Sequence, residues 1–158
     1  MIELRLTDAP EAFACEVIRS GVLASSIAAA GSTCRRTLAV ILDRGSDAVG
    51  GLVGRTAWDW FYIEWLFVPS ELRGRGLARR ILQLAEDEAV KRGCSGAWLD
   101  TYSFQALNFY RRAGFTVFGE LKDYPAGHAR YFLCKRYGAT SPTSRDVPQR
   151  EEIGTKGC

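Results

Sequence analysis

The residues best suited to chemistry are two glycines and two arginines just before a predicted helix, in the order Arg73-Gly74-Arg75-Gly76. Glycine lets a backbone approach a ligand closely, and the first amide N–H groups of a helix have no partner within it. The positive end of the helix dipole and the arginine charges favour an anion at the same place. The pattern therefore predicts a phosphate-binding turn.

Two common phosphate-binding motifs do not fit this turn. A dinucleotide-binding loop needs a third small residue after the two glycines, and Arg79 stands at that position. A P-loop needs Gly-Lys followed by Ser or Thr, which the sequence lacks. We therefore expect neither a dinucleotide nor a nucleoside triphosphate bound in the usual way.

Hydrophobic patterning predicts the elements that position the turn. Residues 2–7 alternate apolar and polar side chains, as in a half-buried strand, and two helices follow at 8–19 and 22–30. The other predicted elements are strands at 37–42, 48–56, 61–68, 97–101, 115–121 and 129–135 and helices at 76–93 and 106–113. The strand at 97–101 follows a helix, so it should pair in parallel with the strand at 61–68.

The predicted strand at 61–68 is the most apolar of the chain, and Glu64 is its only carboxylate. Period-two alternation would place Glu64 on the same face as Leu66 and Val68, where it could serve as a general base. A simple ion pair with an arginine is the alternative. Glycines at 50, 51 and 54 in the preceding strand indicate a bulge or close packing.

Composition limits the class of protein. A chain of 158 residues with a net charge of +3 fits one domain and offers no electrostatic reason to bind nucleic acid. Five cysteines without a Cys-x-x-Cys pair, and one histidine, predict neither a disulfide framework nor a metal site. The charged N-terminus is unlike a signal peptide, and no stretch approaches about 18 uncharged apolar residues. We expect a cytoplasmic protein without a membrane span.

The last residues differ in character from the rest. Residues 138–158 contain two prolines and few large apolar side chains, too little apolar surface to order a segment. We therefore predict one domain at residues 1–137 and a flexible tail at 138–158.

Two motifs resemble those of the GCN5-related N-acetyltransferase (GNAT) family. The predicted turn matches the family's Arg/Gln-x-x-Gly-x-Gly/Ala pyrophosphate motif in Arg73-Gly74-Arg75-Gly76-Leu77-Ala78. Residues 103–115 resemble the second motif, Asn-x-x-Ala-x-x-Phe-Tyr-x-x-x-Gly-Phe, with Ser103 in place of the asparagine. One predicted helix and one predicted strand separate the motifs, as in the family. The resemblance implies an α/β (α+β) fold with a splayed, mixed and mostly antiparallel sheet of seven strands, flanked by about four helices.

The resemblance also implies a cosubstrate, acetyl-CoA, and roles for particular residues. Backbone amides of residues 74–78 would hold its pyrophosphate. Backbone groups of Leu66, Phe67 and Val68 would pair with the pantetheine arm and polarise the thioester carbonyl. Tyr110 matches the family tyrosine that protonates the departing thiolate. Ser103 and, more weakly, Asn108 are candidate pantetheine ligands.

The identity of the general base stays open at this point. Glu64 occupies the place where similar polyamine-acetylating members carry a glutamate, His128 is the only histidine, and a water relay would also serve. No cysteine falls in either motif, which favours direct transfer in a ternary complex over a covalent acetyl-cysteine.

We therefore predict an acetyl-CoA-dependent N-acetyltransferase that acts on a primary amine of a small molecule. The alternatives are acetylation of a protein lysine or N-terminus, and a non-catalytic acyl-CoA-binding sensor. Similar proteins are often homodimers, although no residue of this chain demonstrates a dimer.

Overall fold

A six-stranded sheet is the scaffold of the computed structural model, which describes residues 2–138. The chain divides into two compact units, residues 1–33 and residues 34 onward, and the sheet belongs to the second. Its spatial order is β1-β2-β3-β4-β6-β5. The strands are β1 (Arg36–Arg44), β2 (Asp47–Ala57), β3 (Trp60–Phe67), β4 (Gly96–Tyr102), β5 (Thr116–Lys122) and β6 (Ala129–Arg136).

One neighbouring pair in the sheet is parallel. β3 and β4 run in the same direction, whereas the other neighbours are antiparallel. The helix α2 (Leu77–Lys91) connects β3 to β4, which is the crossover that a parallel pair requires. The mixed, mostly antiparallel sheet and the parallel pair are confirmed as predicted.

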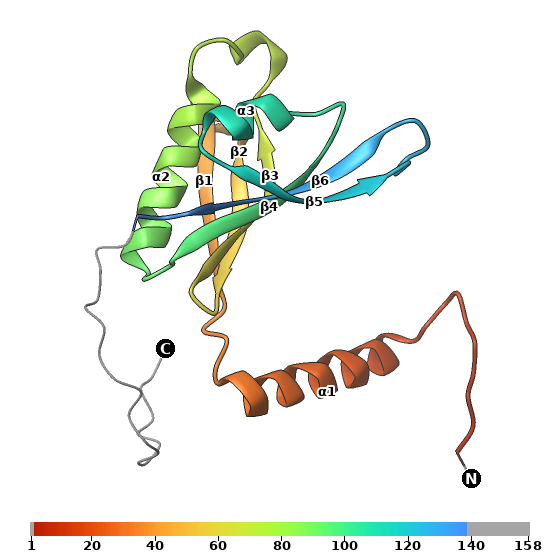
Figure 1. Cartoon of the computed structure of the whole chain (residues 1–158). Helices are drawn as coiled ribbons and strands as arrows, with labels where there is room; N and C mark the ends of the chain where they lie inside the picture. Colours follow the sequence, from red (N-terminus) through yellow and green to blue (C-terminus); the bar gives the residue numbers. More distant parts are fainter. Residues whose placement is uncertain (1, 139–158) are drawn as a thin grey trace. The chain divides into compact units, whose positions relative to one another are not determined.

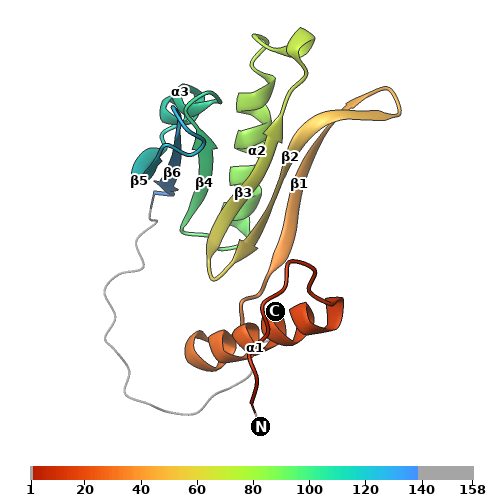
Figure 2. The same ribbon diagram turned by 90° about the vertical axis from the view of Figure 1, so that its right-hand side faces the viewer.

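The core lies between α2 and one face of the sheet (Figures 1 and 2). The buried side of α2 carries Ile81, Leu82, Ala85 and Ala89, at the 3–4 residue spacing that makes one helical stripe. The fully buried side chains Phe61, Leu52, Leu99 and Leu133 of the sheet belong to the same cluster. The short helix α3 (Leu107–Arg112) adds Tyr110 to it.

Glycines in β2 allow neighbouring backbone to come unusually close. A Cβ atom at Gly54 would lie 2.2 Å from the carbonyl oxygen of Tyr62, and one at Gly51 would lie 2.2 Å from that of Val40. The β2–β3 register shifts between Val53 and Gly54. The predicted bulge and close packing are both present.

The first residues differ from the prediction. Residues 2–7 are irregular and exposed, so the described residues contain six strands and the predicted seventh is wrong. Alternation suits a strand only when a partner strand supplies hydrogen bonds, and none does here.

The two predicted helices at 8–19 and 22–30 are one helix, α1 (Ala12–Ala30), which runs through Gly21. A glycine inside a helix costs only about 1 kcal/mol, so it need not end one. The described residues thus hold three α-helices and the short 3-10 helix η1 (Ser70–Leu72).

α1 is apolar around most of its circumference and buries none of its side chains. By length and composition alone it could cross a membrane, but core helices of soluble proteins pass the same test. It carries a Glu16–Arg19 ion pair of 2.6 Å. α1 therefore gives only weak evidence for a membrane contact. The predicted tail at 138–158 lies, apart from its first residue, outside the described residues.

A pair of leucines on α2 tests the assigned core. Leu82 is 2% exposed and Leu84 is 58% exposed. We expect Leu82→Ala to lower the free energy of unfolding by about 2–5 kcal/mol because it leaves a cavity, and Leu84→Ala to lower it by under about 1 kcal/mol. Urea unfolding followed by tryptophan fluorescence measures both, and equal losses would contradict the placement of α2.

Candidate active site

The sheet opens where β3 and β4 stop pairing. Their register runs from Trp60↔Gly96 to Ile63↔Leu99, although β3 continues to Phe67 and β4 to Tyr102. Figure 2 shows the two strands diverging toward their carboxyl ends. Beyond Ile63, the edge of β3 that faces β4 therefore has backbone groups free for a ligand. The predicted cosubstrate contacts Leu66, Phe67 and Val68 all lie in this stretch.

The turn after β3 has the geometry of an anion site. Gly74 and Gly76 have φ of +74° and +73°, which a residue with a Cβ rarely adopts. Gly76 is the N-cap of α2 and no side chain caps the helix. Within the described chain, no hydrogen bond uses the amide N–H groups of residues 74–79. These donors point to an anionic partner supplied by a ligand.

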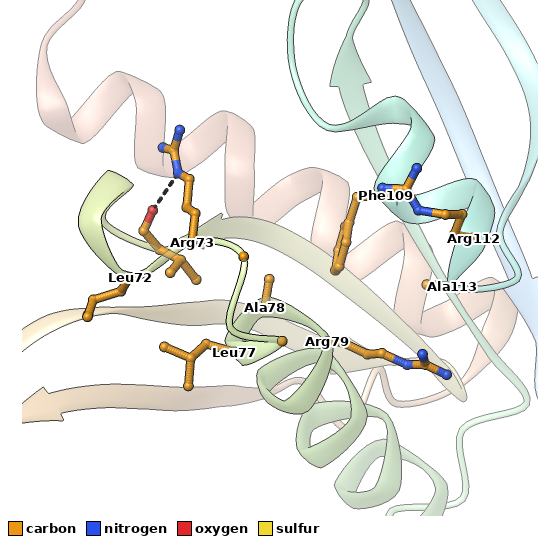
Figure 3. Close-up of a pocket in the computed structure, with 11 residues that line it drawn as sticks. Leu72, Arg73, Leu77, Ala78, Arg79, Phe109, Arg112 and Ala113 are labelled. Carbon is orange, nitrogen blue, oxygen red and sulfur yellow. Dashed lines mark hydrogen bonds between the residues drawn. The ribbon is translucent and has the colours of Figure 1, made fainter.

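Arg73 ties this turn to the end of β3. Its Nε donates a hydrogen bond of 3.0 Å to the carbonyl oxygen of Val68, drawn as the dashed line in Figure 3. The carbonyl of Val68 is thus already bonded to protein. Arg73 consequently shapes the turn as well as adding charge to it.

A cavity of about 380 Å³ lies between the turn and α3. Its walls are formed by Val68, residues 72–74 and 76–79, Phe109, Arg112 and Ala113. In Figure 3 the ring of Phe109 points from α3 toward the first turn of α2, which carries Ala78. The cavity combines apolar walls with backbone donors and arginines, as an extended arm ending in phosphates requires.

Tyr110, on the short helix α3, lies in the core cluster. It is 7% exposed, and its ring packs edge-on against Phe109 and Phe115, at centroid distances of 5.1 and 5.8 Å. Burial, and secondarily the negative charge of Asp100, raise the pKa of Tyr110 to about 12. The hydroxyl therefore keeps its proton throughout the neutral range and has it available to donate.

Glu64 does not lie on the predicted face of β3. The bulge leaves it without a register partner, and it forms an ion pair with Arg55 of β2. Leu66 pairs with the buried Leu52, whereas Arg55 pairs with Tyr62 on the other face. The expectation of a face shared with Leu66 and Val68 is wrong because one extra residue reverses the alternation. The alternative, an arginine partner, is what the structure contains.

The remaining predicted ligands lie at the ends of β4 and α3. The hydroxyl of Ser103 accepts a 3.2 Å hydrogen bond from the amide of Ala129 and lies 3.3 Å from Nδ1 of His128. These bonds attach the end of β4 to the start of β6. Asn108 is exposed on α3. Neither residue lines the cavity beside the turn.

Sequence reasoning missed a polar group on the face of the sheet away from α2. The carboxylate of Asp100 accepts hydrogen bonds from Nε of Arg130 at 2.7 Å and from the hydroxyl of Tyr62 at 3.3 Å. Tyr62 in turn stacks on Trp98, with centroids 4.1 Å apart. Asp100 is the only charged residue of β4, the same signal that singled out Glu64 in β3.

Comparison with known proteins decides the family. The model of the acetyltransferase (GNAT) family matches residues 9–115. An acetyltransferase of Agrobacterium fabrum is 41% identical over 133 residues, which cover 84% of this chain and 97% of that protein. The chain belongs to the GNAT acetyltransferase family.

Other relatives agree with this assignment. The blasticidin-S acetyltransferase of Streptomyces morookaense is 38% identical over 94 residues, 59% of this chain and 68% of that protein. The crystal structure of an Agrobacterium tumefaciens protein superimposes with a TM-score of 0.81 and 39% identity, covering 86% of this chain and all (100%) of the other. This GNAT domain is thus an acyltransferase that uses acetyl-CoA.

Alanine substitutions at two glycines that flank α2 distinguish an effect on ligand binding from an effect of backbone strain. Gly76 and Gly93 have φ of +73° and +84°, and a Cβ at either would meet no atom within 4 Å. Alanine at either should cost about 1–2 kcal/mol of stability. We expect only Gly76→Ala to weaken CoA binding, by about tenfold or more, because only Gly76 adjoins the free amides. Calorimetric titration with CoA measures this, and equal affinities in both variants would contradict the assigned anion site.

Alkaline unfolding tests the environment of Tyr110. Because its pKa is raised from 10.0 to about 12, the neutral phenol stabilises the fold fully below pH 10 and loses that contribution as pH rises toward 12. Tyr110→Phe should reduce the slope of unfolding free energy against pH between these limits by up to about 1.4 kcal/mol per pH unit. Tyr124→Phe, at a 46% exposed site, is the control and should leave the slope unchanged.

Proposed function

We propose that this protein transfers the acetyl group of acetyl-CoA directly to a primary amine of a small molecule. The proposal is carried by the end of β3–β4 pairing after Ile63↔Leu99 and by the cavity that the turn with its free amides shares with α3, the helix that carries Tyr110. The similarity to a blasticidin-S acetyltransferase supports a small-molecule acceptor. A cytoplasmic location suits acetyl-CoA as donor.

On the donor side, the turn binds the pyrophosphate through the amides of Gly74, Arg75, Gly76, Leu77 and Ala78. Arg73 holds the turn against β3 through its bond to Val68. The free edge of β3 at Leu66 and Phe67 pairs with the pantetheine arm, and Ser103 and Asn108 border the path of the arm from the side of β4 and α3. Acetyl-CoA supplies an activated thioester carbonyl when it is bound.

In the reaction, the residues of the opening align the reactants and handle charge. A backbone N–H of β3 donates to the carbonyl oxygen as negative charge develops there. Tyr110 donates its proton to the departing sulfur, and its low dielectric surroundings strengthen that hydrogen bond. Alignment alone can contribute about 7–11 kcal/mol to lowering the barrier.

Glu64 is the proposed acceptor of the proton that the amine must lose. It is the first residue of β3 beyond the last pair with β4, so its carboxylate lies at the opening. The ion pair with Arg55 holds that carboxylate in place. His128 contacts Ser103 at the end of β4, which makes it the second candidate.

Turnover of an amine panel tests this function. With acetyl-CoA and blasticidin S, nourseothricin, benzylamine or a lysine peptide as acceptors, we expect free-thiol release with at least one small amine and none with the peptide. Tyr110→Phe and Glu64→Gln should each lower kcat by about 10²-fold or more, the usual range for general acid–base residues. Tyr124→Phe should retain wild-type kcat.

Two other outcomes would contradict the proposal. Release with the peptide alone would indicate a protein acetyltransferase. Tight acetyl-CoA binding by calorimetry without turnover of any amine would indicate a sensor module.

A further inference from the structure

Two carboxylates lie at equivalent positions on the two diverging strands. Ile63 and Leu99 are the last paired residues of β3 and β4, and Glu64 and Asp100 follow them directly. Each is the only charged residue of its strand. The sheet therefore opens between two acidic side chains.

Both carboxylates lie on the face of the sheet away from α2. On β4, Ala97, Leu99 and Thr101 are buried in alternation, so Asp100 points the other way. Glu64 lies on the same face as Asp100. It forms an ion pair with Arg55, which is the register partner of Tyr62, and the hydroxyl of Tyr62 donates a hydrogen bond to Asp100. A chain of contacts thus links the two acids through Tyr62.

Each acid forms an ion pair with an arginine, Asp100 with Arg130 and Glu64 with Arg55. The guanidinium of Arg130 contacts Oδ2 of Asp100 through Nη2 at 2.6 Å, while among residues 2–138 the contact of Oδ1 is the 3.3 Å hydrogen bond from Tyr62. The side chain of Asp100 is 13% exposed. Because a carboxylate oxygen accepts two hydrogen bonds, Oδ1 retains room for a further donor.

Asp100 also lies across the sheet from the proposed acid. Its charge contributes to the raised pKa of Tyr110, which belongs to the buried face. Tyr110 belongs to the core and Asp100 faces away from it, so a thioester in the opening would have Tyr110 on one side and the acceptor on the side of Asp100.

We propose that Asp100 binds the ammonium form of the acceptor at the opening, opposite Glu64. Tyr62 and Arg130 position the carboxylate, and the acceptor is a primary amine that is protonated at neutral pH. This inference rests on the proposed function, because it places the acceptor relative to Tyr110. Asp100 thus recognises the cation, and Glu64 accepts the proton that the amine loses.

The test compares cations with neutral molecules of the same shape. The probes are benzylamine against benzyl alcohol and 1,4-diaminobutane against 1,4-butanediol, titrated by calorimetry into wild-type protein saturated with CoA. We expect each amine to bind about tenfold or more tightly than its alcohol, and Asp100→Asn to reduce that ratio at least about fivefold, because the substitution removes the charge that strengthens the hydrogen bond and keeps the shape of the side chain. Acetyl-CoA affinity should change less than about twofold.

Two control variants separate recognition from structure. Arg130→Gln removes a positioning partner but keeps the carboxylate, so it should lower the amine-to-alcohol ratio by less than Asp100→Asn does. Glu120→Gln, an exposed carboxylate on β5, should leave every parameter unchanged. With an amine that is turned over, Asp100→Asn should raise the KM of the amine more than it lowers kcat.

The inference is overturned if wild-type protein shows no preference for amines, or if Asp100→Asn keeps the wild-type ratio. These failures are distinct from failure of the proposed function. Turnover with an unchanged ratio in Asp100→Asn would retain the acetyltransferase and remove this role of Asp100. A preference for amines without turnover would retain the role of Asp100 in cation binding and contradict the proposed acetyltransferase activity.

Discussion

The loss of backbone pairing between β3 and β4 after Ile63↔Leu99 is the constraint on which the rest of the site depends. A parallel pair that continued to the ends of both strands would close the sheet, and its edge groups would have no capacity for a ligand. The strands part because each keeps its pairing on the outer side, β3 with β2 and β4 with β6. The bulge at Glu64 increases the local twist and helps β3 turn away.

The helix that follows depends on the same constraint. α2 must begin near the end of β3 and return to start β4, so its amino end lies beside the opening. Its uncapped N-terminus and the two left-handed glycines then face the space that the strands leave. The buried stripe of α2 fixes this position with far more apolar surface than the turn itself provides. The position of the anion-binding turn thus depends on apolar packing of α2 against the sheet.

Sequence patterns predicted the elements that carry strong periodicity or glycine signals. The stripe of α2, the turn at Gly74 and Gly76, and the parallel crossover all follow from local rules, and each is present. The alternation at residues 2–7 failed because strand formation needs a partner that local sequence does not reveal. The predicted helix boundary at Gly21 is wrong because the free-energy cost of a glycine inside a helix is smaller than the gain from one continuous helix.

The sequence predicted the backbone geometry of the turn in the candidate site, but it predicted the orientation of the side chains only in part, and their roles stay predictions. Tyr110 is buried as its helical stripe requires. The orientation of Glu64 depends on a one-residue register shift, which the glycines indicated but could not locate. Asp100 was missed because its importance comes from where pairing with β3 ends, a long-range property of the sheet.

The alternation of β4 has a practical consequence for changing the specificity of this enzyme. Odd-numbered positions such as Leu99 belong to the core, whereas even-numbered positions such as Trp98, Asp100 and Tyr102 face the opposite side of the sheet. The two faces of β4 are thus in different environments, the apolar core on one side and polar side chains on the other. Mutant libraries confined to the even positions would vary the proposed acceptor surface while the packing of α2 stays intact, so the acceptor range could change without rebuilding the fold.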